Sequence, residues 1–441
     1  MNCVSSYRIK IKHYNKIFRD TVNIYKHAVT FFINVILNEW SDLSKHKSGS
    51  FATRDIELLT HVTKNNPTPK YDFDKSFYKM PTYLRRSAIS DAFGIVSSYK
   101  SLHQNWLDDG KVGSEPKLQQ KHNKLPTFYY KNMFVGDCFS DEGKIKIYHN
   151  NDWIWLNVKF RNQDIKYFNR HCRNKKISAP ILEYHYGTYY LRFAVSEKTK
   201  LNNTNIKDQK ILSVDLGLNT FATCSVMDYK GTVYDRKFIN FPYEKDLLNH
   251  KLNRLKKFQR QHGSKNSKGQ WSFINNLNRD ISIKVSKEII SFATEHKVDV
   301  IVFEHLDVKG KKCGNNAQRL QLWRKKDIQH RVEANAYKHG IRVTTVNPSN
   351  TSKLAYDGSG VVKRNNKNYS ICTFSTGKTY NCDLNASYNI GARYFIRELL
   401  KPLSVTKRSQ LEAKVPVIVR RTQCTLSTLI SLSKVLNAIG V

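Results

Sequence analysis

A short apolar run with one carboxylate at its end, residues 211–219 (ILSVDLGLN), constrains the fold most strongly. Ile211, Leu212 and Val214 are typical of a buried strand, and the glycine two positions after Asp215 favours a tight turn. Residues 222–226 form a second apolar run, which predicts a hairpin partner for this strand. A carboxylate at such a place is costly to bury unless a metal ion or a polar partner compensates its charge.

Two further stretches have a carboxylate at a corresponding place. Residues 298–306 (VDVIVFEHL) predict a strand with Glu304 near its end, and residues 381–390 (NCDLNASYNI) predict a helix that begins near Asp383. Acids at such positions can converge at one edge of a mixed sheet, where oxygen ligands suit Mg²⁺ and two ions can hold a phosphodiester. Each acid alone is equally typical of a helix cap or a surface charge, whereas the three together favour a shared site.

The charge of the chain indicates the class of its partners. The 441 residues include 74 Lys and Arg against 36 Asp and Glu, a formal net charge of +38, and 12% are aromatic. Such an excess attracts polyanions, and aromatic residues beside basic ones are typical of nucleic-acid surfaces. A membrane surface is the alternative for charge alone, but no apolar run approaches about 18 residues and the amino terminus has no signal-peptide core. We therefore expect a cytoplasmic, prokaryotic, nucleoid-associated protein.

The amino-terminal half combines strand and helix patterns. Residues 6–13 alternate apolar and basic side chains, as a half-buried strand does. Residues 15–40 and 83–106 have apolar side chains at helical spacing, whereas the polar stretch 42–81 predicts loops. Further strands are predicted at 128–130, 144–148, 153–160 and 181–195. Together with the first strand they predict a small β-barrel into which the two long helices are inserted.

The three acid-bearing stretches also resemble those of a known family. ILSVDLGLN, VDVIVFEHLDVKGKK and DLNASYNIGA are similar to the three RuvC-type nuclease motifs of the TnpB (OrfB) transposon proteins and of the miniature type V CRISPR effectors. The resemblance covers about residues 211–397. It implies that Asp215, Glu304 and Asp383 are the catalytic, metal-binding acids of an RNA-guided DNA endonuclease. It also implies two Mg²⁺ ions as cofactors, with Mn²⁺ as a substitute.

The predicted fold class is α/β, with several α+β domains. A RuvC-type, RNase H-like mixed sheet with helices follows a small β-barrel, which the resemblance identifies as a wedge domain carrying a helical recognition domain. The predicted boundaries are 1–13 and 125–205 for the barrel, 14–124 for the recognition domain, 206–350 and 381–441 for the nuclease domain, and 351–380 for a degenerate, zinc-ribbon-like hairpin that binds target nucleic acid.

The chain departs from the family in that hairpin. Family members have two Cys-x-x-Cys pairs there, but here Thr351-Ser352 are followed by KLAYDGSG, and of the expected second pair only Cys372 remains. Four soft ligands cannot be assembled, so no structural zinc is expected. Cys382 stands where the family has an Arg beside the catalytic Asp. The eight scattered cysteines predict no disulfides.

The resemblance implies guide RNA and a DNA target, double-stranded and single-stranded, as partners, and no membrane. Two alternatives remain open: a guide-directed repressor that binds without cleavage, and an unguided RNase H-fold resolvase or transposase. Monomer and homodimer also remain open. The predicted nucleic-acid contacts are basic side chains of the second long helix and of the segments beyond the first two acids: Arg85, Arg86, Lys251, Arg254, Lys256, Lys257, Arg260, Lys311, Lys312, Arg324 and Lys325.

Overall fold

The chain forms two compact units, which are described separately here. In this computed structural model they comprise Asn2–Glu197 and Lys198–Val441. The predicted domain limit at residue 205 lies shortly after the division between them. The residues that the structure describes are 2–12, 16–64, 66–119, 121–137, 139–185, 187–263, 267–305, 324–365 and 368–438.

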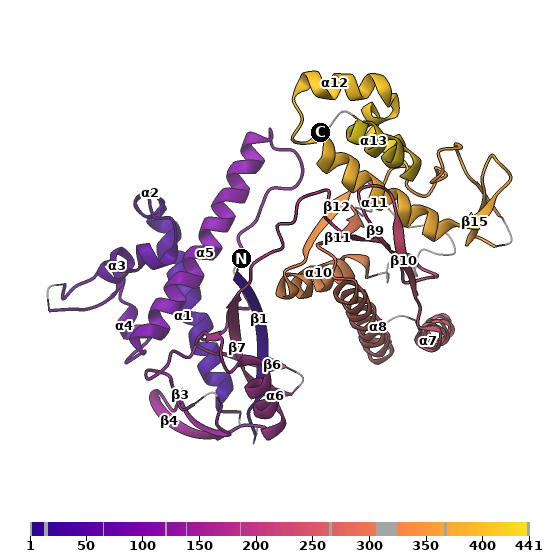
Figure 1. Ribbon diagram of the computed structural model, residues 1–441. Coiled ribbons are helices and arrows are strands. Elements are labelled where there is room, and N and C mark those ends of the chain that lie inside the picture. The colour runs from indigo at the N-terminus through magenta and orange to yellow at the C-terminus, as the bar shows by residue number, and fades with distance from the viewer. Residues whose placement is uncertain are drawn as a thin grey trace. The chain divides into compact units, whose positions relative to one another are not determined.

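Helices of the amino-terminal unit pack around two long members, α1 and α5, which lie against each other (Figure 1). Both were predicted from apolar side chains at helical spacing. The predicted loop 42–81 is wrong in part, because α3 forms within it and packs on α5. A helix after the predicted strand 153–160, α6, was also missed. The helices are α1 (Phe18–Asn38), α2 (Trp40–Leu43), α3 (Gly49–Thr60), α4 (Phe73–Ser76), α5 (Thr82–Asp108) and α6 (Asn162–Cys172).

Two small sheets complete this unit. An antiparallel bridge between Ile11 and Phe160 joins them where β1 and β4 end. Closure into a complete barrel stays a prediction. One sheet contains β1 (Asn2–Lys10), β5 (Lys176–Ile177), β6 (Ile181–His185) and β7 (Thr188–Lys198), and the other contains β2 (Phe134–Val135), β3 (Glu142–His149) and β4 (Asp152–Lys159).

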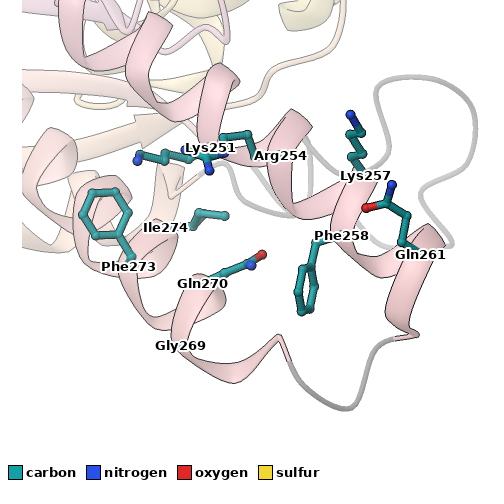
Figure 2. A pocket seen from close by; sticks show the side chains of 9 residues that line it. All are labelled: Lys251, Arg254, Lys257, Phe258, Gln261, Gly269, Gln270, Phe273 and Ile274. Carbon is teal, nitrogen blue, oxygen red and sulfur yellow. The ribbon is translucent and has the colours of Figure 1, made fainter.

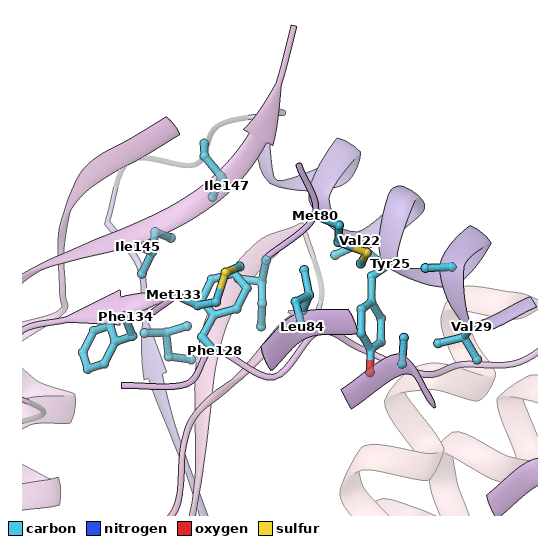
Figure 3. Close-up of a cluster of buried hydrophobic side chains, with 14 of the residues drawn as sticks. Val22, Tyr25, Val29, Met80, Leu84, Phe128, Met133, Phe134, Ile145 and Ile147 are labelled. Carbon is cyan, nitrogen blue, oxygen red and sulfur yellow. The ribbon is translucent and has the colours of Figure 1, made fainter. Parts of the chain in front are cut away.

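A single hydrophobic core holds the helices and sheets of this unit together. Figure 3 shows side chains from α1, α5 and the strands meeting in it. Tyr25 is fully buried there, and its hydroxyl lies 3.0 Å from the Ser87 hydroxyl and donates to Asp91 at 2.8 Å. Because a buried phenol needs such partners, these bonds fix α1 against α5.

A five-stranded mixed sheet forms the centre of the carboxy-terminal unit. Its order is β10-β9-β8-β11-β12, with antiparallel pairing from β10 to β8 and parallel pairing from β8 to β12. The predicted hairpin and mixed sheet are therefore confirmed. The strands are β8 (Ile211–Asp215), β9 (Ala222–Met227), β10 (Val233–Ile239), β11 (Val300–Glu304) and β12 (Arg342–Val346).

Helices cover both faces of this sheet (Figure 1). Leu212 and Val214 face a core that includes α8 and α10, whereas Ile211 faces a core that includes α11 and α13. Both faces are buried, as the continuous apolar runs predicted. Among the described residues, no helix is long and apolar enough to cross a membrane. The elements are α7 (Pro242–His262), α8 (Lys268–Glu295), α10 (Lys325–Ala336), η1 (Tyr337–His339), α11 (Cys382–Leu400), α12 (Val405–Lys414), η2 (Pro416–Val419), η3 (Arg421–Gln423) and α13 (Leu426–Ala438).

A small three-stranded sheet precedes α11. It contains β13 (Lys363–Arg364), β14 (Ile371–Thr373) and β15 (Thr379–Asn381). Its interior is apolar and includes the thiols of Cys372 and Cys382. The treatment of 14–124 and 351–380 as separate domains stays a prediction.

We expect a methyl group at Gly391 to destabilise the carboxy-terminal unit. A Cβ on this α11 residue would lie 2.1 Å from Met227 Sδ and 3.2 Å from Ser213 Cβ. Gly391→Ala should therefore lower the free energy of unfolding by about 1–3 kcal/mol, measured by urea denaturation. Gly94→Ala is the matched control in α5, where a Cβ meets nothing within 4 Å, and it should be neutral or stabilising by about 0.5–1 kcal/mol. Equal stability of the Gly391→Ala protein and wild type would contradict this packing.

We also expect the purified protein to contain no stoichiometric zinc. The small sheet brings two thiols into an apolar interior, whereas a structural zinc ion takes four nitrogen or sulfur ligands. Elemental analysis of protein dialysed without chelator measures this directly. About one zinc ion per chain, lost in a Cys372→Ser variant, would show that the small sheet is a metal site after all.

Candidate active site

Two of the predicted acids lie side by side at one edge of the mixed sheet. β8 and β11 pair in parallel, with Val214 opposite Phe303, and each strand ends at the next residue. Those residues are Asp215 and Glu304. Because both strands run in the same direction, their carboxyl ends share one edge, where open α/β sheets commonly form their sites.

The third acid reaches the same place from the start of α11. Asp383 is the second residue of this helix, and the Asn381 side chain accepts hydrogen bonds from the backbone N–H groups of Asp383 and Leu384 at 2.9 and 3.0 Å. Such a cap fixes where the helix begins. Further along, the hydroxyls of Ser387 and Ser225 lie 2.6 Å apart, which holds α11 against β9.

Burial raises the pKa of all three acids, and like charge adds to this effect at Asp215. Burial raises the pKa of Asp215 well above its ordinary value, and the negative charges of Glu304 and Asp383 raise that pKa further. Burial also raises the pKa of Glu304 and of Asp383. The positive charge of Arg364, on β13, partly offsets this effect on the pKa of Asp215 and of Asp383.

The predicted acids are therefore close enough for the charges of Glu304 and Asp383 to act on Asp215, but they do not form a complete set of metal ligands. Over the described residues, no group of three or more His, Cys, Asp or Glu side chains is arranged so that it could hold a metal ion. The donor chemistry nevertheless suits a hard divalent cation, because all three side chains offer carboxylate oxygens and their like charges repel one another.

A hydroxyl that the sequence did not reveal as functional holds one of these acids. The Oγ1 atom of Thr351 donates a hydrogen bond to Oε1 of Glu304, and both residues are buried. The amide of Asn389, a buried residue of α11, donates to the Thr351 carbonyl at 3.0 Å. The helix that carries Asp383 thus also positions the partner of Glu304. The sequence signal that could have indicated this role is the pair Asn385 and Asn389, two polar residues four positions apart in a buried helix.

Arg393 is a second residue that the sequence did not identify. It is only 6% exposed, and its guanidinium donates to four backbone carbonyls, those of Asn347, Ser349, Thr422 and Cys424, at 2.6 to 3.1 Å. These bonds fasten the segment before Thr351 to α11. Burial lowers the pKa of Arg393, which the neighbouring charges of Cys424 and Glu304 oppose.

The predicted nucleic-acid contacts fall into different environments. Arg254, Lys256, Lys257 and Arg260 are exposed on α7, and Lys251 on the same helix is half-buried. Such an exposed basic face is compatible with nucleic-acid binding.

Other members of that set are engaged within the protein. Arg85 is buried, and together with the more exposed Arg86 it binds Glu57. Burial by itself would raise the pKa of Glu57, but the hydrogen bonds from the two arginines lower it below its ordinary value. Lys325 is buried, and its charge lowers the pKa of Glu304, although burial keeps that pKa above its ordinary value. Arg324 lies 3.9 Å from Asp327. Lys311 and Lys312 lie outside the described residues.

Cys382 is buried in the apolar interior of the small sheet, directly before Asp383. The family Arg expected at this position is therefore replaced by a packing residue. Arg364 pairs with Cys372 across β13 and β14, and its charge lowers the pKa of both Cys382 and Asp383 against the effect of burial. Positive charge near the acids thus comes from Arg364 on β13, and not from the residue directly before Asp383.

Two family models match the chain. One is described as the Aq_aa04 family and matches residues 5–149, and the other, described as Cas12f1-like, TNB domain, matches residues 326–390. Both curated relatives are from Aquifex aeolicus (strain VF5). "TnpB-like protein aq_aa05" is 28% identical over 226 residues, 46% of this chain and 72% of that protein. "Uncharacterized protein aq_aa04" is 28% identical over 125 residues, 28% of this chain and 70% of that protein.

Solved structures that match the chain include two complexes with guide RNA, both with TM-scores below 0.5. The Cas12f1-sgRNA-target DNA complex is matched with a TM-score of 0.49 and 14% identity, over 85% of this chain and 81% of that one. The AacC2c1-sgRNA binary complex is matched with a TM-score of 0.41 and 10% identity, over 86% and 70%. The sequence relative and the TNB-domain match agree in showing that the chain is similar to TnpB-like proteins and to miniature type V CRISPR effectors.

Proposed function

We propose that the chain is an RNA-guided DNA endonuclease that hydrolyses phosphodiester bonds at Asp215, Glu304 and Asp383. The observation that carries this proposal is the convergence of the three acids at one edge of the mixed sheet, where the charges of the other two raise the pKa of Asp215. One buried and two half-buried carboxylates that repel one another are costly to hold together for stability alone. A bound cation would relieve the repulsion among these carboxylates.

The fit of Mg²⁺ to these residues rests on donor chemistry. Asp215, Glu304 and Asp383 would hold the ions through their carboxylate oxygens, which would have to draw closer than in the described structure. Bound Mg²⁺ supplies Lewis-acid stabilisation of the phosphodiester oxygens. Manganese, which takes the same oxygen ligands, is expected to substitute.

The surrounding residues of the chain orient these acids. The Thr351 hydroxyl occupies one oxygen of Glu304, so it determines which way the carboxylate presents its other oxygen. Asn389 and Arg393 hold the segment of Thr351 against α11, the helix that also carries Asp383. Arg364 contributes positive charge near Asp215 and Asp383, which would favour an approaching phosphate.

Guide RNA and target DNA are the proposed partners. The net charge of +38 favours a polyanionic partner, and the chain is similar to TnpB-like proteins and to the Cas12f1-like TNB domain. Base pairing with the guide would supply sequence recognition, while the protein would contact backbone and duplex shape. Guide-directed binding without cleavage is the alternative, and the same experiments distinguish it.

Asp215→Ala should abolish cleavage and leave guide-dependent DNA binding intact. The substitution removes a carboxylate from the acid cluster, whereas binding depends on basic surfaces and base pairing. We expect a cleavage rate at least about 100-fold lower in a plasmid assay with Mg²⁺ and matched guide RNA.

A gel-shift measurement run beside that assay should show unchanged affinity for the target. Asp208→Ala, which removes an exposed acid of the same unit, is the matched control and should cut like wild type. If Asp215→Ala cuts at the wild-type rate, the acids are structural. If the wild-type protein binds its target but never cuts with Mg²⁺, the repressor alternative replaces the nuclease.

Thr351→Val should slow cleavage by about 10- to 100-fold, because the isosteric side chain cannot donate to Glu304. The Mg²⁺ concentration that gives half-maximal cleavage should rise as well, since the orientation of a ligand is lost. Thr351→Ser keeps the hydroxyl and should restore both quantities. Thr351→Val with wild-type cleavage at every Mg²⁺ concentration would show that this hydrogen bond only stabilises the fold.

A further inference from the structure

A second site lies between the last turns of α7 and the first turns of α8, away from the acid cluster in sequence. It is a cavity of about 570 Å³ that side chains of both helices line (Figure 2). One of its lining residues, Ile274, is held in place because it packs with Leu252 and Leu255 in a buried hydrophobic cluster between the two helices. A volume in this range is typical of pockets that accept one small ligand.

Three cations of α7 give the pocket an uncompensated positive charge. Lys251, Arg254 and Lys257 line it, and no acidic residue is among the described residues that do so. No Asp or Glu occurs between Asp246 and Asp280 in the sequence. The pocket therefore selects an anionic ligand.

Two aromatic rings also line this pocket, and they favour a ligand that has a flat ring of its own. Phe273 of α8 lines it and is 50% exposed, and the Nζ atom of Lys251 lies 5.2 Å from the centre of its ring. Phe258 of α7 lines it from the other helix, and Figure 2 shows Gln270 between the two rings. A small inorganic anion would use neither ring. Aromatic faces beside cations suit a nucleobase joined to phosphate, and the amide of Gln270 can pair with a base edge.

We propose that this pocket receives one unstacked nucleotide of a single-stranded nucleic acid. The base would lie against Phe258 and Phe273, beside Gln270, and Lys251, Arg254 and Lys257 would bind the adjoining phosphates. A duplex keeps its bases stacked inside the helix and would meet only the charges. The site is a binding site, so the inference does not depend on cleavage at the acid cluster.

The test measures how much the bases contribute to the affinity of the protein for a single strand. Full-length protein stripped of RNA is titrated by fluorescence anisotropy with labelled oligothymidylate of about 12 nucleotides and with an abasic strand of the same length. Phe273→Ala and Phe258→Ala should weaken binding of the intact strand by roughly tenfold and leave the abasic strand unchanged. Lys257→Gln should weaken both strands and reduce the salt slope by about one.

Controls separate the pocket from its surroundings. Phe273→Trp should keep the preference for the intact strand, because it preserves the stacking surface. Phe238→Ala, which removes an exposed ring of β10, should also keep the preference. An oligouridylate titrated in parallel shows whether RNA or DNA is preferred, and either preference supports the site.

Three results would overturn the proposal. The Phe258→Ala and Phe273→Ala proteins could bind the intact strand as tightly as wild type, with circular dichroism showing that they are folded. The loss could be equal for intact and abasic strands, which would make the rings structural. A duplex of the same length could show the same dependence on Phe273, which would exclude an unstacked base.

Discussion

The parallel pairing of β8 with β11 is the interaction on which the rest of the carboxy-terminal unit depends. It brings the ends of two strands to one edge, and each strand ends in an acid, Asp215 and Glu304. Helices cover both faces of the sheet, and Glu304 is buried while Asp215 is half-buried, so burial raises the pKa of both carboxylates. The start of α11 adds Asp383, and the charges then raise the pKa of Asp215 together.

Much of this architecture was predictable from periodicity, because strands buried on both faces have continuous apolar runs. Ile211 to Val214 and Val300 to Phe303 are such runs, and their strands form as expected. α3 and α6 were not predicted because they are short, at 12 and 11 residues, and α3 lies within a stretch that is polar as a whole. α3 is stabilised by packing on α5, in which its side chains Ala52 and Ile56 are buried. Such a tertiary contact cannot be seen in the local sequence.

The site was predictable only as far as the acids themselves. Thr351 lies 47 positions from Glu304, and nothing local links them before the chain folds. Positive charge in the sequence was also ambiguous. Arg85 and Lys325 were expected to contact nucleic acid, yet both are buried beside acids of the protein, whereas Lys257 is exposed on a helix face. The number of basic residues in the sequence indicates the class of partner. Which of these residues are exposed enough to contact that partner is known only from the structure.

The most direct test of the account begins with the RNA bound to the protein. RNA that copurifies with the wild-type chain is sequenced, and a plasmid that matches its variable segment is incubated with the complex in Mg²⁺, Ca²⁺ or chelator. The account predicts that the matched plasmid is cut in Mg²⁺ alone and that a mismatched plasmid stays intact. Protein that carries no RNA, or cutting that is indifferent to sequence match, would contradict an RNA-guided, metal-dependent nuclease.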